Sequence, residues 1–482
     1  MTMTVIARAL VLVLVSCLPA YSQTRPEHDG KRAYFGTLHA HSELSGDVSV
    51  ANGLSPEEAF DYARTHGLDF LGVSDHHKHP DAPGGAQYHM EDSEYQTLLD
   101  AAGAINLANP GTFVAIPGIE WGTVATGNHI NIFGAATLPP DTIADTEYDE
   151  LFAWVKTAAR FAQCNHPYAW AAESDENLDV GNYGLALYAS TDLYVAAADP
   201  ALQLMSVICY TPSGHSGSEE KPHRETHSKA LQIYREHLNY GLHLSPAGNQ
   251  DTHKSNPGAA SAARTGVWAD ELTLDGIAEA MSANRVFATE DDELAVGFQV
   301  RHSGVTYWMG ETVPLDAESE VTVVVHVEQA PGSDGDSVEE GPYTARVHID
   351  QDGVGGAFAA ELSVYEFASA GDWEFPVTVA PGQYFFLEIE EKGGKDNPLG
   401  DGEDAAGADG GTDPDGFRDD LSDSAWTSPV WFSAGSSGAT YVWSVNSTLY
   451  HDPGCWAVAQ IGAANRREGP APAGKTKHLC PN

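Results

Sequence analysis

Histidine, aspartate and glutamate residues recur after short apolar runs in the first two-thirds of the chain. The candidate ligands are His39, His41, Asp47, His76, Glu120, His129, His166, Asp251 and His253, with Asp75 beside His76. Imidazole combined with carboxylate suits zinc, iron or manganese, whereas an all-oxygen set would suit calcium or magnesium. A single histidine would more often be a surface or core residue, but recurrence at six apolar runs favours a metal centre. Because a carboxylate can bridge two ions, the set can hold more than one.

Short apolar runs alternate with amphipathic helical stretches from Tyr34 to about Phe287, which indicates a βα-repeating, mostly parallel α/β architecture. Loops at the C-terminal ends of such strands converge on one cavity, so ligand residues at strand ends are expected to meet. The expected strands are Tyr34 to Leu38, Phe70 to Val73, Phe113 to Ile119, Ile130 to Phe133, Phe161 to Cys164, Leu204 to Cys209 and Leu242 to Ala247.

One helix in this region has clear start and stop signals. Ser55 is a candidate N-cap, Pro56 suits the first helical position, and Glu58 completes a capping box. Gly67 is the expected stop. A second helix is expected over about 225–241.

Four separated motifs resemble those of the PHP (polymerase and histidinol phosphatase) metallohydrolases, over roughly Tyr34 to Thr289. They are His39-x-His41, Ser74-Asp75-His76, Pro117-Gly118 leading to Glu120, and Asp251-x-His253. The resemblance implies a distorted (β/α)7 barrel, in agreement with seven expected strands. It also implies two or three divalent transition metal ions (zinc, manganese or iron).

The resemblance also assigns the ligands to three ions. The first would be held by His39, His41, Glu120 and Asp251, the second by bridging Glu120 with His129 and His166, and the third by Asp47, His76 and His253. Asp75 would orient a ligand histidine. His77 and His79 are expected at the pocket rim or on the surface.

The predicted activity is hydrolysis of a small-molecule phosphate ester by metal-activated water. Arg264 would steady the phosphate oxygens, although a surface salt bridge is an equal interpretation. The alternative is carbamate or carboxylic ester hydrolysis, with Trp121 and Trp268 lining an apolar pocket. A non-catalytic cell-surface binding protein is a third alternative, and the complete ligand set argues against it.

Beyond Glu290 the hydrophobic period changes to two, which predicts an antiparallel β-sandwich-like domain. The predicted division is a barrel over 30–290, the β domain over 291–433 with an Asp/Gly-rich loop at 393–423, and a small Cys/His-containing module over 434–482. Asn284 to Thr289 and Ala425 to Trp431 resemble the exported CehA/McbA-type branch of the PHP proteins, whose named members hydrolyse an aryl carbamate.

The formal net charge of −45 disfavours binding to nucleic acid or other polyanions. Residues 1–22 resemble a signal peptide, with Arg8 before an apolar run, which predicts a periplasmic, secreted or outer-surface protein. Cleavage after Ser22 and lipid attachment at Cys17 are both compatible with the pattern. Outside the cell, Cys455 and Cys480 would form a disulfide, bind zinc with His451 and His478, or remain free thiols.

Overall fold

The structure is a computed structural model. It describes residues 25–48, 53–82, 85–122, 129–144, 147–165, 198–199, 201–209, 224–259, 263–291, 293–329, 341–350, 363–392, 422–434, 441–444, 447, 449–451, 458, 461, 465–469 and 476–477. The predicted signal peptide with Cys17, the ligand candidate His166, residues 393–421, Cys455, His478 and Cys480 lie outside this part. Cys164 is buried. Among the described helices, none is both long and apolar enough to cross a bilayer.

Seven strands lie side by side in chain order. They are β2 (Lys31–Thr37), β3 (Phe70–His77), β4 (Val114–Trp121), β5 (Ile130–Phe133), β6 (Phe161–Cys164), β7 (Leu204–Cys209) and β8 (Ser245–Asn249). Neighbours are parallel except around β5, which is antiparallel to both β4 and β6. The chain is therefore a mixed α/β protein, with each of the seven expected strands present and some of their limits shifted.

Main-chain contacts join the first and last of these strands. Just beyond β2 and β8, Ala40 and Thr252 form an isolated parallel bridge. The His41 amide donates to the Thr252 carbonyl at 3.0 Å, and the Asp251 amide donates to the His39 carbonyl at 2.9 Å. These bonds bring the two ends of the seven-strand run together at the ligand-bearing segments.

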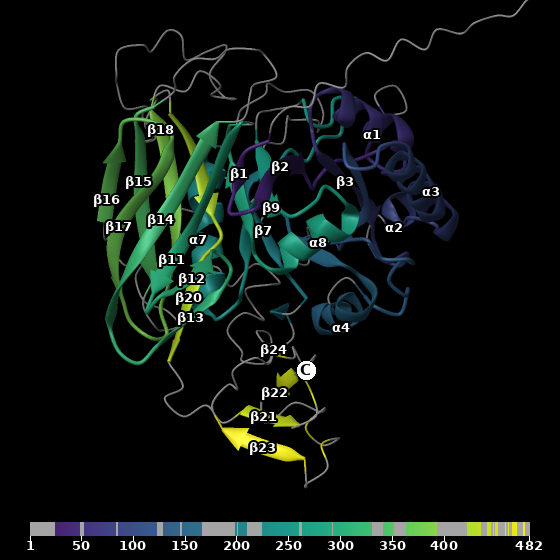
Figure 1. Ribbon diagram of the computed structural model, residues 1–482. Helices are drawn as coiled ribbons and strands as arrows, with labels where there is room; N and C mark the ends of the chain where they lie inside the picture. The colour runs from purple at the N-terminus through teal and green to yellow at the C-terminus, as the bar shows by residue number, and fades with distance from the viewer. Residues whose placement is uncertain are drawn as a thin grey trace, which may run out of the picture.

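Helices α1 (Pro56–Thr65), α2 (Gly85–Tyr88), α3 (Asp92–Ala108) and α4 (Tyr148–Ala158) lie on the side of the seven strands away from the antiparallel layers (Figure 1). The capping box of α1 is confirmed: the Ser55 hydroxyl accepts from the Glu58 amide, and the Glu58 carboxylate accepts from the Ser55 amide. Gly67 follows with φ of 90°, a conformation that glycine adopts without steric cost.

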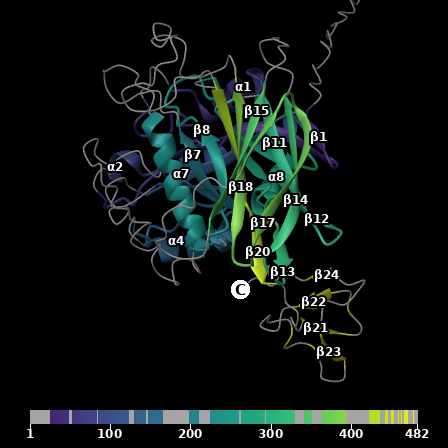
Figure 2. The same ribbon diagram turned by 90° about the vertical axis from the view of Figure 1, so that its left-hand side faces the viewer.

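Helix α7 (Arg224–Asn239) lies beside β7, β8 and β18 in the view of Figure 2. The Tyr384 hydroxyl of β18 donates to the Arg235 carbonyl at 3.2 Å, and Tyr234 packs edge-on against Phe386. Helix α7 therefore joins the seven-strand part to the strands that follow it in the chain. Helix α8 (Leu274–Ser282) begins at Thr273, whose hydroxyl accepts from the Gly276 amide.

The sheet continues beyond β2 through strands that pair antiparallel, except for the outermost pair, which is parallel. These are β9 (Arg264–Ala269), β10 (Val286–Thr289), β19 (Ser422–Thr427), β18 (Tyr384–Lys392), β20 (Val430–Ala434) and β13 (Thr312–Leu315), with β15 (Tyr343–Asp350) and β16 (Ser363–Phe367) on a branch from β18. Because β10 pairs with β19, sheet hydrogen bonds link the two regions that the sequence divides at residue 290. The domain limits stay a prediction.

A separate four-stranded antiparallel sheet packs on this extension. Its order is β12 (Val305–Trp308), β11 (Leu294–His302), β14 (Ser319–Gln329) and β17 (Gly371–Val379). The period-two pattern is clear in β17, where Phe375, Val377 and Val379 are buried and the residues between them are exposed. Phe298 of this sheet stacks on Phe385 of the other layer at 5.4 Å. Two facing antiparallel layers therefore form, as the alternation predicts.

Two small features complete the described fold. Strand β1 (Glu27–His28) pairs with the start of β2. Near the C-terminus, β21 (Tyr441–Ser444), β22 (Leu449–His451), β23 (Arg466–Gly469) and β24 (Thr476–Lys477) form a second four-stranded sheet, which projects from the rest in Figure 1.

Candidate metal centre

Strands β3 and β4 run farther than the sequence predicts. Their parallel register continues through Asp75, His76 and His77, and it places His76 opposite Glu120. All eight residues of each strand are buried, so these polar side chains belong to the interior and not to a loop. The strand extension therefore delivers two of the predicted ligands to one point.

The first predicted ligand set is brought together. His39 Nε2 lies 3.1 Å from Glu120 Oε1 and 3.1 Å from Asp251 Oδ1. His41 Nε2 lies 3.5 Å from Glu120 Oε2 and 3.1 Å from Asp251 Oδ1. All four side chains are almost fully buried. Donors around one tetrahedral zinc ion lie about 3.3 Å apart, so these separations fit a single ion.

Glu120 also contacts two further histidines. Its Oε1 lies 2.9 Å from His129 Nδ1, and its Oε2 lies 3.0 Å from His76 Nδ1. His129 therefore lies where the predicted second ion requires it, and His76 is an additional neighbour that the sequence assigned to the third ion only. His166 is outside the described residues. The position of the Glu120 carboxylate, between two groups of donors, suits a bridging ligand.

The predicted third set forms a cluster of its own. Asp47 Oδ2 lies 2.9 Å from His76 Nε2 and 3.1 Å from His253 Nε2. The Ser45 hydroxyl donates to Asp47 Oδ1 at 2.8 Å and lies 3.0 Å from His41 Nδ1. Among the described residues, ligand atoms of His41, Asp47, His76 and His253 all lie within 4.8 Å of one another. Ser45, which the sequence did not single out, joins this cluster to the first.

Carboxyl groups and imidazoles in the centre shift the pKa values of one another. Burial opposes ionisation of the carboxyl groups, yet the neighbouring histidines hold the pKa values of Asp47, Glu120 and Asp251 below their usual range. Burial also opposes charge on His76, but Glu120 and Asp47 raise its pKa to about 10. By contrast, burial and the nearby His253 lower the pKa of His41 to about 3. A divalent cation would take the place of the protons that compensate these carboxylates.

An amide network beneath Glu120 was missed by the sequence interpretation. Asn165 Nδ2 donates to Glu120 Oε1 at 2.8 Å and to Asn131 Oδ1 at 2.5 Å. Gln163 Nε2 donates to Asn165 Oδ1 at 2.8 Å, and Asn249 Nδ2 donates to Gln163 Oε1 at 3.2 Å. All four amides are fully buried. The available signal was a polar residue inside otherwise apolar strands, as in Ile130-Asn131-Ile132.

Replacing Asn165 with alanine is expected to weaken metal binding by about 10- to 100-fold, because hydrogen bonds to a ligand fix its orientation. The measurement is metal affinity by competition with a chelator. Asn106→Ala is the control, since Asn106 also makes two amide hydrogen bonds, to the main chain of Ala115, but at the opposite end of β4 from Glu120. Equal metal affinities in the two variants would contradict a positioning role for Asn165.

Asp75 contacts Ser42, the residue that follows His41. Its carboxylate accepts hydrogen bonds from the Ser42 amide at 2.6 Å and the Ser42 hydroxyl at 2.7 Å, and none from the ligand histidines within the described part of the chain. Burial raises the pKa of Asp75 to about 6, against the effect of these hydrogen bonds. Asp75 therefore holds the residue that follows His41 in place, which positions the loop leading to Asp47.

The remaining predicted residues have mixed positions. Arg264 is buried at the start of β9, where its Nη1 donates to the Ala263 carbonyl at 2.9 Å; contact with a phosphate stays a prediction. Trp268 donates to the Val296 carbonyl inside the core shared with the four-stranded sheet, so it does not line a pocket at the centre. Trp121 is buried against Tyr148.

The predicted rim residues are close to the centre in sequence but differ in exposure. His77 is buried, and burial with the nearby His89 lowers its pKa to about 4. Its ligand atoms group with those of His89 and Asp141. His79 is on the outside, where its Nε2 lies 2.7 Å from the Asp141 carbonyl oxygen.

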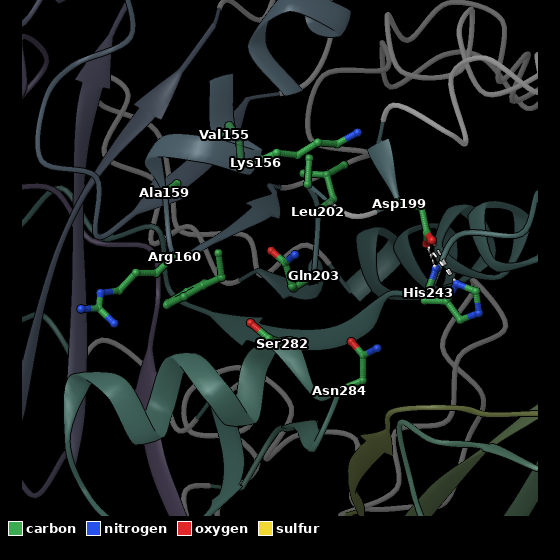
Figure 3. Close-up of a pocket in the computed structure, with 12 residues that line it drawn as sticks. Val155, Lys156, Ala159, Arg160, Asp199, Leu202, Gln203, His243, Ser282 and Asn284 are labelled. Carbon is green, nitrogen blue, oxygen red and sulfur yellow. Dashed lines mark hydrogen bonds and ion pairs between the residues drawn. The ribbon is translucent and has the colours of Figure 1, made fainter. Parts of the chain in front are cut away.

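A separate cavity of about 360 Å³ lies at the N-terminal ends of β6, β7 and β8. Figure 3 shows its lining, in which Asp199 pairs with His243 while the side chains of Lys156 and Arg160 extend away from the middle. Arg160 pairs with Asp275. The ligand clusters lie at the opposite, C-terminal ends of the strands, so this cavity is not part of the metal centre.

No family model matches the sequence, and no curated protein matches it. The structure is similar to that of a two-domain protein from Bacteroides vulgatus described as containing a predicted PHP-like metal-dependent phosphoesterase. The identity is 14%, the match covers 83% of this chain and 98% of the other, and the TM-score is 0.40. It is also similar to PsfC from Pseudomonas syringae, at 16% identity, 49% and 82% coverage and a TM-score of 0.29. Values this low leave the function to be argued from the site.

Proposed function

We propose that this chain is a metal-dependent hydrolase that cleaves small-molecule phosphate esters with water, using two or three divalent transition metal ions. One observation carries the proposal: the buried Glu120 carboxylate lies within 3.5 Å of four imidazole nitrogens and belongs to two groups of ligand atoms, one with His39 and His41 and one with His76 and His129. A carboxylate shared in this way is typical of sites that hold two ions for displacement at phosphorus.

The donor set fits the proposed ions. Imidazole nitrogens and carboxylate oxygens suit zinc, manganese and iron, and the mixture excludes a dedicated calcium site. Bound transition metal ions lower the pKa of a water ligand to about 7 and stabilise negative charge on an attacked phosphoryl group. The chain's own residues would hold and orient that arrangement: Asp251 bridges the two histidines of the first cluster, and Asn165 orients Glu120.

The net negative charge of the chain is compatible with a small anionic substrate that binds only at the metal site. With a net charge of −45, the surface repels an approaching phosphate over distances up to the screening length of about 8 Å. Binding therefore requires local positive charge, which divalent ions held by the clustered ligands would provide. Among the described ligands, Glu120 and Asp251 are buried, Asp47 is partly buried, and all three pair with histidines, so they would not oppose a phosphate group directly.

One argument for the alternative, carbamate or carboxylic ester hydrolysis, does not hold. It requires an apolar pocket for an aryl group, and Trp268, which was expected to line it, lies in another core. The same activated water could still attack a carbonyl carbon, so these substrates belong in the assay as competing outcomes.

The test compares metal-stripped protein with protein reloaded with zinc, manganese or iron. Four substrates are assayed: 4-nitrophenyl phosphate, bis(4-nitrophenyl) phosphate, 4-nitrophenyl acetate and 1-naphthyl methylcarbamate. We expect chelation to reduce phosphate ester hydrolysis to the background rate and reloading to restore it. Reloaded protein that cleaves only the acetate or the carbamate would overturn the phosphoesterase assignment, and activity that survives complete metal removal would overturn the metal dependence.

A further inference from the structure

A second group of metal-ligating side chains lies on the four-stranded sheet, away from the centre described above. Its members are His28 on β1, His326 on β14 and Asp372 on β17, whose ligand atoms all lie within 4.8 Å of one another. His326 and Asp372 are direct cross-strand partners. His28 comes from the other end of the chain, on the short strand that Figure 1 shows beside this sheet.

The two histidines face the same carboxylate. His326 Nδ1 lies 2.6 Å from Asp372 Oδ1, and His28 Nδ1 lies 3.9 Å from the same oxygen. The two rings are stacked, with centroids 4.4 Å apart and planes 19° apart. One ligand atom from each ring and one from Asp372 therefore lie within 4.8 Å of one another.

The opposite edge of the His326 ring is already occupied. Its Nε2 lies 3.2 Å from Glu328 Oε2, two residues along the strand. If Nε2 carries the proton and donates it to Glu328, the lone pair of Nδ1 points at the Asp372 carboxylate. A carboxylate behind the outer nitrogen is the usual arrangement that orients a metal-binding histidine.

One ring nitrogen of His28 is buried without a hydrogen bond: among the described residues, its Nε2 has no hydrogen-bond partner. The ring packs edge-on against Trp308 at 5.4 Å and Trp268 at 6.3 Å. An ion pair between His326 and Asp372 alone would not include His28, whereas a shared metal ion would bind all three side chains.

We propose that His28 Nδ1, His326 Nδ1 and Asp372 Oδ1 bind one zinc ion that fastens β1 to the four-stranded sheet. Tetrahedral zinc places its donors about 3.3 Å apart, and the separations of 2.6 and 3.9 Å lie on either side of that value. The Asp372 side chain is 60% exposed, so solvent can supply a fourth ligand. The site is independent of the proposed hydrolytic activity.

The ion would strengthen a weak attachment. Strand β1 has two residues, which pair with Arg32 and Lys31 of β2, and the Ala33 amide donates to the Pro26 carbonyl just before it. It is attached to the four-stranded sheet by the ring contacts of His28 and by Asp29, whose carboxylate accepts hydrogen bonds from Gln299 and Trp308. A zinc ion would add bonds from β1 to two strands of the four-stranded sheet, which lie about 300 residues later in the chain.

The test measures zinc content and thermal stability of the full chain after metal stripping and reloading with zinc. We expect His28→Gln and His326→Gln each to retain one equivalent fewer than the wild-type protein, while hydrolytic activity is unchanged. Added zinc should raise the Tm of the wild-type protein by more than that of either variant. Asp372→Asn, at an exposed position, provides a third variant that is compatible with folding if a histidine replacement is not.

His348→Gln is the matched control, because His348 also pairs with a carboxylate across strands, Glu388 at 2.6 Å, but is in no group of metal-ligating side chains among the described residues. This control should keep the wild-type zinc content. Equal zinc content in the wild-type protein and in the His28, His326 and Asp372 variants would overturn the proposal. A fall in Tm without loss of zinc would also overturn it, since that result means an ion pair only.

Discussion

Glu120→Ala is expected to reduce kcat/KM for the metal-loaded protein by about 1,000-fold or more, which corresponds to roughly 4 kcal/mol of transition-state stabilisation. The variant should also bind less metal at both groups of ligands that include Glu120. The reason is geometric, since one carboxylate oxygen contacts His39 and His129 while the other contacts His41 and His76. Metal analysis and steady-state kinetics at limiting and saturating metal provide the measurement.

His129→Ala is the informative comparison. The His129 Nδ1 atom contacts Glu120 Oε1, and His129 belongs to one group of donors whereas Glu120 belongs to two, so the loss of His129 should cost less activity, about 10- to 100-fold. Glu320→Ala, an exposed carboxylate of β14, should have no effect. If Glu120→Ala keeps its activity, or if His129→Ala is the more damaging variant, a bridging role for Glu120 is wrong.

Gly248→Ala is expected to lower the free energy of unfolding by about 3 kcal/mol, the upper part of the range for overpacking a rigid site. A Cβ atom at this position on β8 would lie 2.3 Å from the Arg264 carbonyl oxygen and 2.8 Å from its carbonyl carbon, and main-chain atoms cannot rotate away. The strands are also tied here by the Thr265 hydroxyl, which donates to the Gly248 carbonyl at 2.8 Å. Urea denaturation of the metal-loaded protein measures the change.

The same substitution should reduce activity, because Asp251 follows Gly248 by three residues and depends on the position of β8. Gly103→Ala is the matched control: it lies inside α3, and no atom lies within 4 Å of the added Cβ. Alanine is the better helix former there, so stability should rise by up to about 1 kcal/mol. Two variants of equal stability would show that β8 and β9 can separate without cost.

Much of the centre could be predicted from local patterns. The residue types that form metal ligands are visible in the sequence, and the apolar runs before them indicate strands whose ends meet in a parallel architecture. Of the predicted ligands within the described part, all eight lie in contact with at least one other. The capping box of α1 was equally readable, because it involves residues only three positions apart.

The amide network and the double contact of His76 could not be predicted. Strand β3 was expected to stop before Asp75, since a run of polar residues ends an apolar pattern, but pairing with β4 extends it and buries them. Asn165 looks like an ordinary polar residue after a strand until the fold places Glu120, 45 residues earlier, beside its amide. Polar burial of this kind is stabilised by partners that are distant in the chain, and no local period reveals them.

The sequence by itself determined the donor chemistry, the seven strands and the change to an antiparallel pattern after residue 290, because side-chain type and periodicity are local properties. Only the tertiary structure decided that β10 pairs with β19, that Trp268 lies in the second core, and that His28 meets His326. Each of these depends on which surfaces pack together. Hydrophobic burial drives that packing without a preferred direction, so many sets of neighbours satisfy the same local pattern and only the complete fold selects one.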